Sequence, residues 1–170
     1  LEALAKMPAV FRKGGCVTAA NASGITDGAA ALLVTSEAAA ARHGLTPAAY
    51  LLDWEVVGVD PRIMGIGPVP ATRKLLERNE LDYSDIEAVE LNEAFASQAL
   101  ACLAQLPFGS TRVNPDGGAI ALGHPIGATG ARIVVTLLAG MEARGQRLGI
   151  ATLCISGGMG ISLLVERPAS

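Results

Sequence analysis

The chain has 170 residues, of which 51% are apolar and 17% are charged, and its formal net charge is −3. This length allows one domain with a substantial core, and the lack of a basic stripe with interleaved aromatic residues excludes nucleic-acid binding. No run of about 18 apolar residues occurs, so we predict no membrane span. The three cysteines and two histidines lack the spacing of a zinc site or a disulfide framework, which favours a reducing, cytoplasmic location without a metal.

Residues 1–28 form an irregular, glycine-rich start, after which strands and helices alternate. The first residue is leucine and no secretory signal is present, so we interpret the chain as a piece of a longer protein. Short apolar runs predict buried strands, and apolar residues at helical spacing predict helices. The predicted strands cover residues 31–36, 48–60, 85–92, 148–156 and 160–167. The predicted helices cover residues 37–44, 70–79, 93–106 and 128–145.

The order of these elements predicts the α/β class. Strands that alternate with helices are typical of a sheet covered on both faces, which also accounts for the many Ala, Val, Leu and Ile residues. The last two predicted strands are separated only by GGMG, and such a short connection predicts an antiparallel hairpin.

One histidine lies in a glycine-rich loop, NPDGGAIALGHPIGATGAR, over residues 114–132. Gly123, Gly127 and Gly130 do not have the spacing of the dinucleotide fingerprint. The window from residue 118 to 123 has the glycine spacing of a P-loop, but His124 and Pro125 follow where Lys and Ser or Thr are required. We therefore do not interpret the loop as a phosphate cradle.

Three reactive side chains lie at strand ends or in this loop: Asn92, His124 and Cys154. Each also has a purely structural interpretation, because Asn is favoured as a helix N-cap, a histidine can stabilise a loop, and an apolar strand is a common place for an inert cysteine. Together, a carboxamide, an imidazole and a thiol beside small residues indicate a narrow channel for acid–base chemistry. The glycines that follow Cys154 leave backbone N–H groups that could face an oxyanion. We interpret Cys16 and Cys102 as structural and His43 as solvated.

Four motifs, NASGITDGAAA, NEAFA, GGAIALGHPIGATGAR and CISGGMG, resemble in order and spacing the C-terminal part of a thiolase, an acetyl-CoA C-acyltransferase. The resemblance spans essentially the whole chain. It implies a thiolase-like α/β fold, of which this chain is the C-terminal βαβαβαββ half, with a mixed five-stranded sheet and helices on both faces. Residues 1–28 would be the end of the thiolase loop domain and the entry to the second half, and residues 29–170 the thiolase C-terminal domain.

The resemblance also implies a reaction, which is reversible acyl transfer to coenzyme A through an acyl-cysteine. The enzyme would cleave a 3-oxoacyl-CoA by thiolysis or condense acetyl-CoA. His124 would activate the nucleophilic cysteine and donate to the thioester oxygen, and Asn92 would hold the water that completes this oxyanion hole. Cys154 would be a second acid/base, and the backbone N–H of Ser156 would contribute to a second oxyanion hole. Residues expected to line the pantetheine channel or lie near it are Phe11, Ser23, Gly24, Met64, Ala94 and Phe95.

The acyl-accepting cysteine of thiolases has no counterpart in this chain, since Cys16 does not lie where the family places it. We therefore expect the chain alone to be inactive and to need an N-terminal thiolase half. Coenzyme A thioesters would be substrates, and no cofactor is expected. The complete protein would be a cytoplasmic homo-oligomer, a dimer or tetramer, acting in fatty acid metabolism. We also predict that the helix after His124 keeps the imidazole neutral through its dipole.

Two other functions are compatible with the fold class. A non-catalytic thiolase-like module would bind acyl-CoA or a lipid or act in assembly, but it would not need the His, Cys and Asn. A ketosynthase relative would use two histidines with its nucleophile, and Cys154 with NEAF disfavours it. The segment MGIGPVPATRK resembles both acetoacetyl-CoA and 3-oxoadipyl-type thiolases, so no acyl chain length is predicted.

Overall fold

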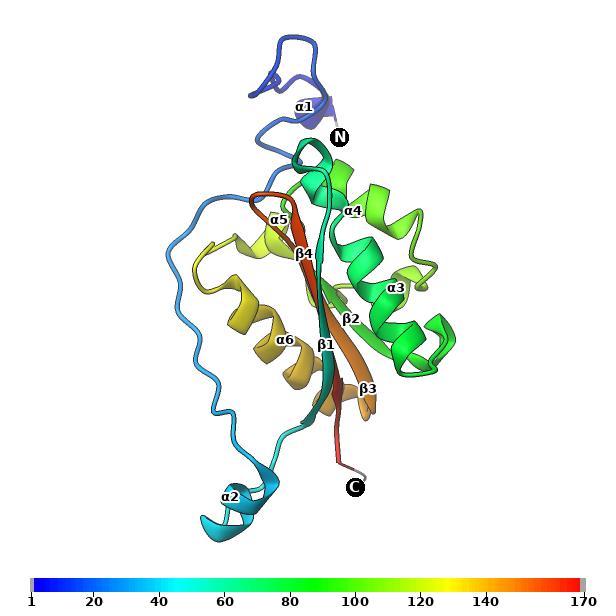
Figure 1. Cartoon of the computed structure of the whole chain (residues 1–170). Helices are drawn as coiled ribbons and strands as arrows, with labels where there is room; N and C mark the ends of the chain where they lie inside the picture. The colour runs from blue at the N-terminus through cyan, green and yellow to red at the C-terminus, as the bar shows by residue number, and fades with distance from the viewer. Residues whose placement is uncertain (1, 169–170) are drawn as a thin grey trace.

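A mixed β-sheet of four strands lies at the centre of the computed structural model, which describes residues 2–168 (Figure 1). The strands lie in the order β1-β4-β3-β2, and β2 and β3 are parallel whereas the other two pairs are antiparallel. In chain order the elements are α1 (Glu2–Ala5), α2 (Glu37–Arg42), β1 (Tyr50–Gly58), η1 (Pro61–Ile66), α3 (Pro68–Arg78), η2 (Tyr83–Asp85), β2 (Ala88–Leu91), α4 (Ala96–Leu103), η3 (Ser110–Arg112), α5 (Ala119–Leu122), α6 (Thr129–Arg144), β3 (Leu148–Ile155) and β4 (Met159–Glu166). The outermost residues of the predicted domains, Leu1 and residues 169 and 170, lie outside the described residues.

Helices cover both faces of the sheet, as the composition predicts. Helices α3 and α4 pack on one face and α6 on the other (Figure 1). Strand β2 is buried along its whole length, and its side chains alternate between the two faces. Val89 and Leu91 join the core with α3 and α4, whereas Ala88 joins the core with α6. The α/β class is therefore confirmed, and the two cores hold the C-terminal end of β2 in place.

Helix α3 begins directly against the last strand. A Cβ atom at Gly67 would lie 2.6 Å from the carbonyl oxygen of Met159, so only glycine allows this approach. Farther along the helix, Thr72 contacts Ser162 at 2.8 Å, and Ser162 donates to Thr152 at 2.7 Å. All three hydroxyls are fully buried and thereby satisfied. These contacts attach α3 to the β3–β4 hairpin that carries Cys154.

The predicted helices and the terminal hairpin are confirmed, but the strand predicted over residues 31–36 is wrong. This segment is an extended chain without strand pairing, and it leads from the N-terminal region to α2 (Figure 1). A strand needs a neighbour that pairs with its backbone N–H and C=O groups, and none lies beside it within residues 2–168. The side chains of Leu33 and Val34 are 79% and 76% exposed, so an apolar segment of strand-like composition is left without a cover.

The sheet was expected to have five strands, and in the described part of the chain it has four, because the segment over residues 31–36 does not join it. Val113 makes a single parallel bridge to Val89 at the outer side of β2. The next residue, Asn114, has a φ of +46° and replaces a strand ladder with its side chain. Its amide donates to the carbonyl oxygen of Leu91 at 2.8 Å and accepts from the Leu91 N–H at 2.9 Å. Pro115 has no N–H to continue a ladder, so pairing ends there.

No helix in the described part of the chain is both long enough and apolar enough to cross a membrane.

Candidate active site

The candidate site lies where the two parallel strands end. Asn92 follows β2 directly, and its backbone N–H donates to the carbonyl oxygen of Thr152 on β3 at 3.0 Å. Cys154 lies farther along β3, beyond the point at which β2 ends, and pairs with Gly160. The carboxyl ends of parallel strands are the usual position of a site in an α/β sheet. Asn92 and the Cys154 hairpin are thus at the same edge.

The N-terminal segment crosses this edge and holds the histidine loop. The His124 N–H donates to the carbonyl oxygen of Gly24 at 2.8 Å. At Gly123, where φ is +95°, a Cβ atom would lie only 2.6 Å from the hydroxyl oxygen of Thr26. Both the left-handed backbone and the close approach therefore require glycine immediately before His124. The imidazole is carried by a loop that contacts the N-terminal segment at both Gly24 and Thr26.

Thr129, the first residue of α6, determines the tautomer of His124. The Thr129 hydroxyl donates to the carbonyl oxygen of Pro125 at 2.9 Å, which uses its single proton. His124 Nδ1 lies 2.7 Å from the same hydroxyl oxygen, so Nδ1 carries the hydrogen and donates. Nε2 then carries the lone pair and is the acceptor nitrogen of the ring. The sequence prediction missed Thr129, and the available signal was a hydroxyl residue at the start of the helix that follows GHP.

The unprotonated nitrogen of His124, Nε2, faces Asn92. The Asn92 Nδ2 atom lies 3.4 Å from Nε2, on the side opposite Thr129. Asn92 Oδ1 is buried and has no hydrogen-bond partner among residues 2–168. The alternative role of Asn92 as a helix N-cap is wrong, because α4 begins at Ala96 with Phe95 before it. Asn92 is instead fully buried against the imidazole.

The site disfavours the charged forms of His124 and Cys154, the two titratable candidate residues. Burial lowers the pKa of His124 below 6.5, and the guanidinium of Arg132 lowers it further. Burial and Arg132 thus account for the lowered pKa of His124, whereas the sequence led us to expect an effect of the α6 dipole. Burial also raises the pKa of the Cys154 thiol. At neutral pH the site therefore holds a neutral imidazole and a protonated thiol.

Five of the residues predicted for substrate binding lie together around the NEAFA segment. Ser23 Oγ donates to the carbonyl oxygen of Ala94 at 3.1 Å, next to Gly24. The rings of Phe11 and Phe95 meet edge to face with centroids 5.7 Å apart. The N-terminal segment and the loop after β2 thus form one surface beside His124.

The remaining predicted residues are less directly connected. Met64 is half-buried in η1, and its neighbour Gly65 accepts a hydrogen bond from Cys102 of α4. Ser156 is exposed in the turn between β3 and β4. Among residues 2–168, no side-chain hydrogen bond joins Cys154 or Ser156 to His124 or Asn92. The structure therefore joins the imidazole and the carboxamide, and it places Cys154 and Ser156 at the same edge of the sheet without a side-chain hydrogen bond to them in the described residues.

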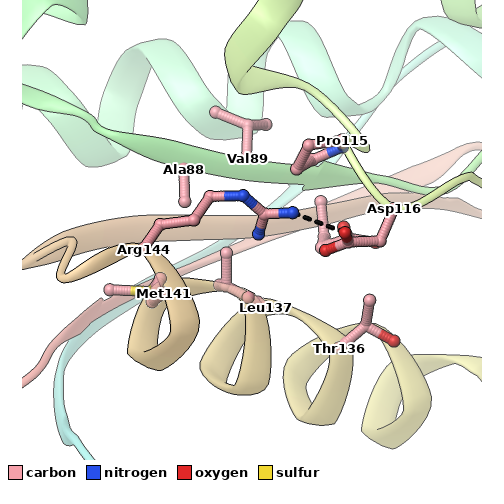
Figure 2. A pocket seen from close by; sticks show the side chains of 10 residues that line it. Ala88, Val89, Pro115, Asp116, Thr136, Leu137, Met141 and Arg144 are labelled. Atoms are coloured by element: carbon pink, nitrogen blue, oxygen red, sulfur yellow. Dashed lines mark hydrogen bonds and ion pairs between the residues drawn. The ribbon is translucent and has the colours of Figure 1, made fainter.

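Two hollows flank the histidine loop. A groove of about 430 Å³ lies between residues 26–30 and residues 125–131. A small cavity of about 10 Å³ lies under β2, and Glu90 lines it together with the Asp116–Arg144 ion pair (Figure 2). Burial raises the pKa of Glu90 to about 7, with Arg132 opposing the rise. In the described residues no group of three His, Cys, Asp or Glu side chains could hold a metal ion.

Comparison with known families identifies the class of protein to which this fold and site belong. The family model "Thiolase, C-terminal domain" matches residues 45–167, and "Thiolase, N-terminal domain" matches residues 1–38. The chain belongs to the thiolase family.

Individual relatives and solved structures within this family are similar to the chain over nearly its whole length. The chain is 57% identical over 166 residues to the acetyl-CoA acetyltransferase of Escherichia coli (strain K12), covering 98% of this chain and 42% of that protein. It is 55% identical over 169 residues to the beta-ketoadipyl-CoA thiolase of Pseudomonas aeruginosa, covering 98% of this chain and 42% of that protein. The crystal structure of the Bacillus anthracis acetyl-CoA acetyltransferase superposes with a TM-score of 0.95 at 48% identity, over 98% of this chain and 42% of that one. The chain thus spans about two fifths of the length of these relatives.

Proposed function

We propose that this chain supplies the acid–base part of a thiolase active site, in a protein that transfers acyl groups reversibly to coenzyme A. The reaction would be thiolysis of a 3-oxoacyl-CoA or condensation of acetyl-CoA. The observation that carries the proposal is the His124 imidazole, held as the Nδ1–H tautomer by Thr129 with Nε2 facing Asn92. The relatives are named as acetyltransferases and thiolases, which supports this chemistry.

His124 would act first as a base and then as a hydrogen-bond donor. The Nε2 lone pair would accept the proton of a cysteine thiol. The cysteine would thereby be activated as a nucleophile. Nε2–H would then donate to the thioester oxygen on which negative charge develops. The lowered pKa of His124 fits the first step, because a neutral imidazole is ready to accept a proton at neutral pH.

Asn92 would complete the same oxyanion hole. Its buried Oδ1 has no partner among the described residues, so it can accept a hydrogen bond from a water. That water would donate its second hydrogen to the thioester oxygen. A buried polar atom without a partner is uncommon in proteins, and a ligand or a bound water at this position would explain it.

Cys154 would be the second acid/base. Its raised pKa keeps the thiol protonated at neutral pH, so it can donate a proton to a carbanion at the substrate α-carbon. In thiolysis the resulting thiolate would then remove the proton of the incoming coenzyme A thiol, which takes the acyl group from the nucleophilic cysteine. In the condensation direction it would remove a proton from the α-carbon. The backbone N–H of Ser156, in the turn that follows, would stabilise the second oxyanion.

The pantetheine arm would run over the surface formed by the N-terminal segment and the NEAFA loop. This surface holds Phe11, Ser23, Gly24, Ala94 and Phe95, with Met64 nearby. A human mitochondrial 3-ketoacyl-CoA thiolase solved in complex with CoA superposes on the chain with a TM-score of 0.92 at 42% identity, covering 99% of this chain and 43% of that one. Apolar side chains and backbone groups of this kind suit a thin, flexible ligand.

An N-terminal thiolase half would bring the nucleophilic cysteine and cover the exposed apolar segment at Leu33 and Val34. We further propose that the complete protein is a dimer or tetramer, located in the cytoplasm and acting in fatty acid metabolism, and that it needs no cofactor. The domain boundary between residues 28 and 29 stays a prediction. A non-catalytic module that binds acyl-CoA or a lipid, or acts in assembly, is the alternative.

The test measures coenzyme A-dependent thiolysis of acetoacetyl-CoA. We expect no turnover by the 170-residue chain alone and turnover by the full-length protein that carries it. In the full-length protein, Cys154→Ala should lower kcat by about 100-fold or more, whereas Cys16→Ala, at an exposed position, should not. Turnover by the chain alone would overturn the proposal. Binding of acetyl-CoA by the full-length protein without turnover would favour the non-catalytic alternative.

A further inference from the structure

Glu93, the residue after Asn92, contacts the histidine loop at a second point. Its Oε2 atom accepts a hydrogen bond from the backbone N–H of Ile120 at 3.2 Å. Ile120 belongs to α5, the short helix that leads into Gly123 and His124. Two consecutive residues therefore contact the same loop, since Asn92 faces the imidazole and Glu93 contacts the backbone before it.

Gly118 shows how closely the Glu93 carboxylate packs on this loop. A Cβ atom at residue 118 would overlap the carboxylate carbon of Glu93 and would lie 2.7 Å from Oε1. The backbone at Gly118 has φ of −98° and ψ of −166°, an extended conformation that any residue adopts. A side chain at residue 118 would therefore have to displace the Glu93 carboxylate, whereas nothing in the backbone calls for glycine.

The loop has few other attachments between its ends. At its start, the Asn114 side chain pairs with both backbone groups of Leu91. At its end, His124 is held by Gly24 and Thr129. Gly117 and Gly123 both have φ values above +90°, and glycine leaves such a segment with more conformational freedom than other residues would. Between these ends the loop is held by the Asp116–Arg144 ion pair and, at Ile120, by Glu93.

We propose that Glu93 is a positioning residue that holds the histidine loop so that Nε2 of His124 faces Asn92 and the substrate. This inference rests on the proposed function for its effect on turnover. Glu93 does not touch the reacting atoms in this account. It acts through the backbone of α5, and Gly118 leaves room for its carboxylate.

The test combines a conservative variant with a double-mutant cycle in the full-length protein. Glu93→Gln keeps an acceptor oxygen of the same size, so kcat should stay within about threefold of the wild type. Glu93→Ala should lower kcat by about 10- to 100-fold with a smaller effect on KM, because a misplaced base impairs the chemical step. Glu77→Ala, which removes an exposed glutamate on α3, is the control and should change neither.

The cycle adds Gly118→Ala alone and together with Glu93→Ala. The added methyl group should lower Tm strongly beside Glu93 and much less once the carboxylate is gone, so the two effects should not add. Additive losses of Tm, or a Glu93→Ala variant with kcat within twofold of the wild type, would overturn the inference.

A further readout separates this inference from the proposed function. The ¹⁵N chemical shifts of the His124 ring should report the Nδ1–H tautomer in Glu93→Gln and a mixture of tautomers in Glu93→Ala. If the wild-type protein showed no acyl transfer, the proposed function would fail, while Tm and the tautomer would still decide the role of Glu93. An unchanged tautomer in Glu93→Ala would then contradict that role.

Discussion

His124 Nδ1 and Thr129 Oγ1 lie 2.7 Å apart, and the same hydroxyl donates its only proton to the carbonyl oxygen of Pro125. This arrangement leaves one way to make both hydrogen bonds, with the ring hydrogen on Nδ1 and the lone pair on Nε2. The basic nitrogen of the site therefore faces Asn92. A threonine that touches no substrate determines which nitrogen of His124 can accept a proton.

Thr129→Val should impair turnover without unfolding the protein. Valine has nearly the same shape but cannot accept the Nδ1–H hydrogen bond, so the ring can adopt the other tautomer. We expect kcat to fall by roughly tenfold, which corresponds to about 1.4 kcal/mol, near the upper end for one hydrogen bond. Steady-state kinetics of the full-length protein measure this. Thr129→Ser keeps the hydroxyl and should retain most of the activity; equal losses in both variants would contradict the role assigned to the hydroxyl.

The pH dependence of kcat/KM should reflect the lowered pKa of His124. A base must be neutral, so activity is present above its pKa and is lost as the pH falls through that value. Because burial and Arg132 both lower this pKa, the midpoint of the acidic limb should lie below 6.5. Arg132→Met should move the midpoint to higher pH, and Arg62→Met, on an exposed side chain, should not. A midpoint above 6.5 in the wild type would exclude His124 as the neutral base.

Glu90 should make the full-length protein less stable as the pH rises. Its pKa is raised from 4.5 to about 7 in the folded state, so folding favours the protonated carboxyl. The resulting contribution to stability is complete below pH 4.5 and is lost as the pH rises through about 7. Glu90→Gln removes this dependence.

Urea unfolding of the wild type and Glu90→Gln at pH 5 and pH 8 measures the effect. The variant should gain stability relative to the wild type between these pH values, by about 2–3 kcal/mol at most. Glu77→Gln, at an exposed glutamate on α3, is the matched control and should show no such gain. A difference between wild type and Glu90→Gln that does not change with pH would contradict the raised pKa.

Local sequence was sufficient to predict the elements that depend on their own residues. Helix α3 begins near Pro70, as expected from the proline and the apolar pair Leu75 and Leu76, both of which are buried. The β3–β4 hairpin follows from two apolar runs joined by GGMG, whose Gly157 and Gly158 have positive φ values. The motifs also predicted Asn92 and His124 for one site, and their side chains lie 3.4 Å apart.

The parts that depend on distant residues were not predictable in this way. The segment around Leu33 is apolar enough for a buried strand, but a strand forms only beside a partner. Beyond β2, the side chain of Asn114 pairs with both backbone groups of Leu91, a contact that no periodicity reveals. The roles of Thr129 and Glu93 appear only once the loop after β2 and the histidine loop lie together, since their residue types are common in other contexts.

The two histidines of the chain permit the most direct test of the central claim, that His124 is the base of an acyl-transfer site. Thiolysis of acetoacetyl-CoA is measured for the full-length protein with His124→Ala and with His43→Ala, which replaces the exposed residue at the end of α2. We expect His124→Ala to lower kcat by about 100- to 10,000-fold. We expect His43→Ala to leave both kcat and Tm unchanged. Turnover by folded His124→Ala within a few-fold of the wild type would contradict the central claim.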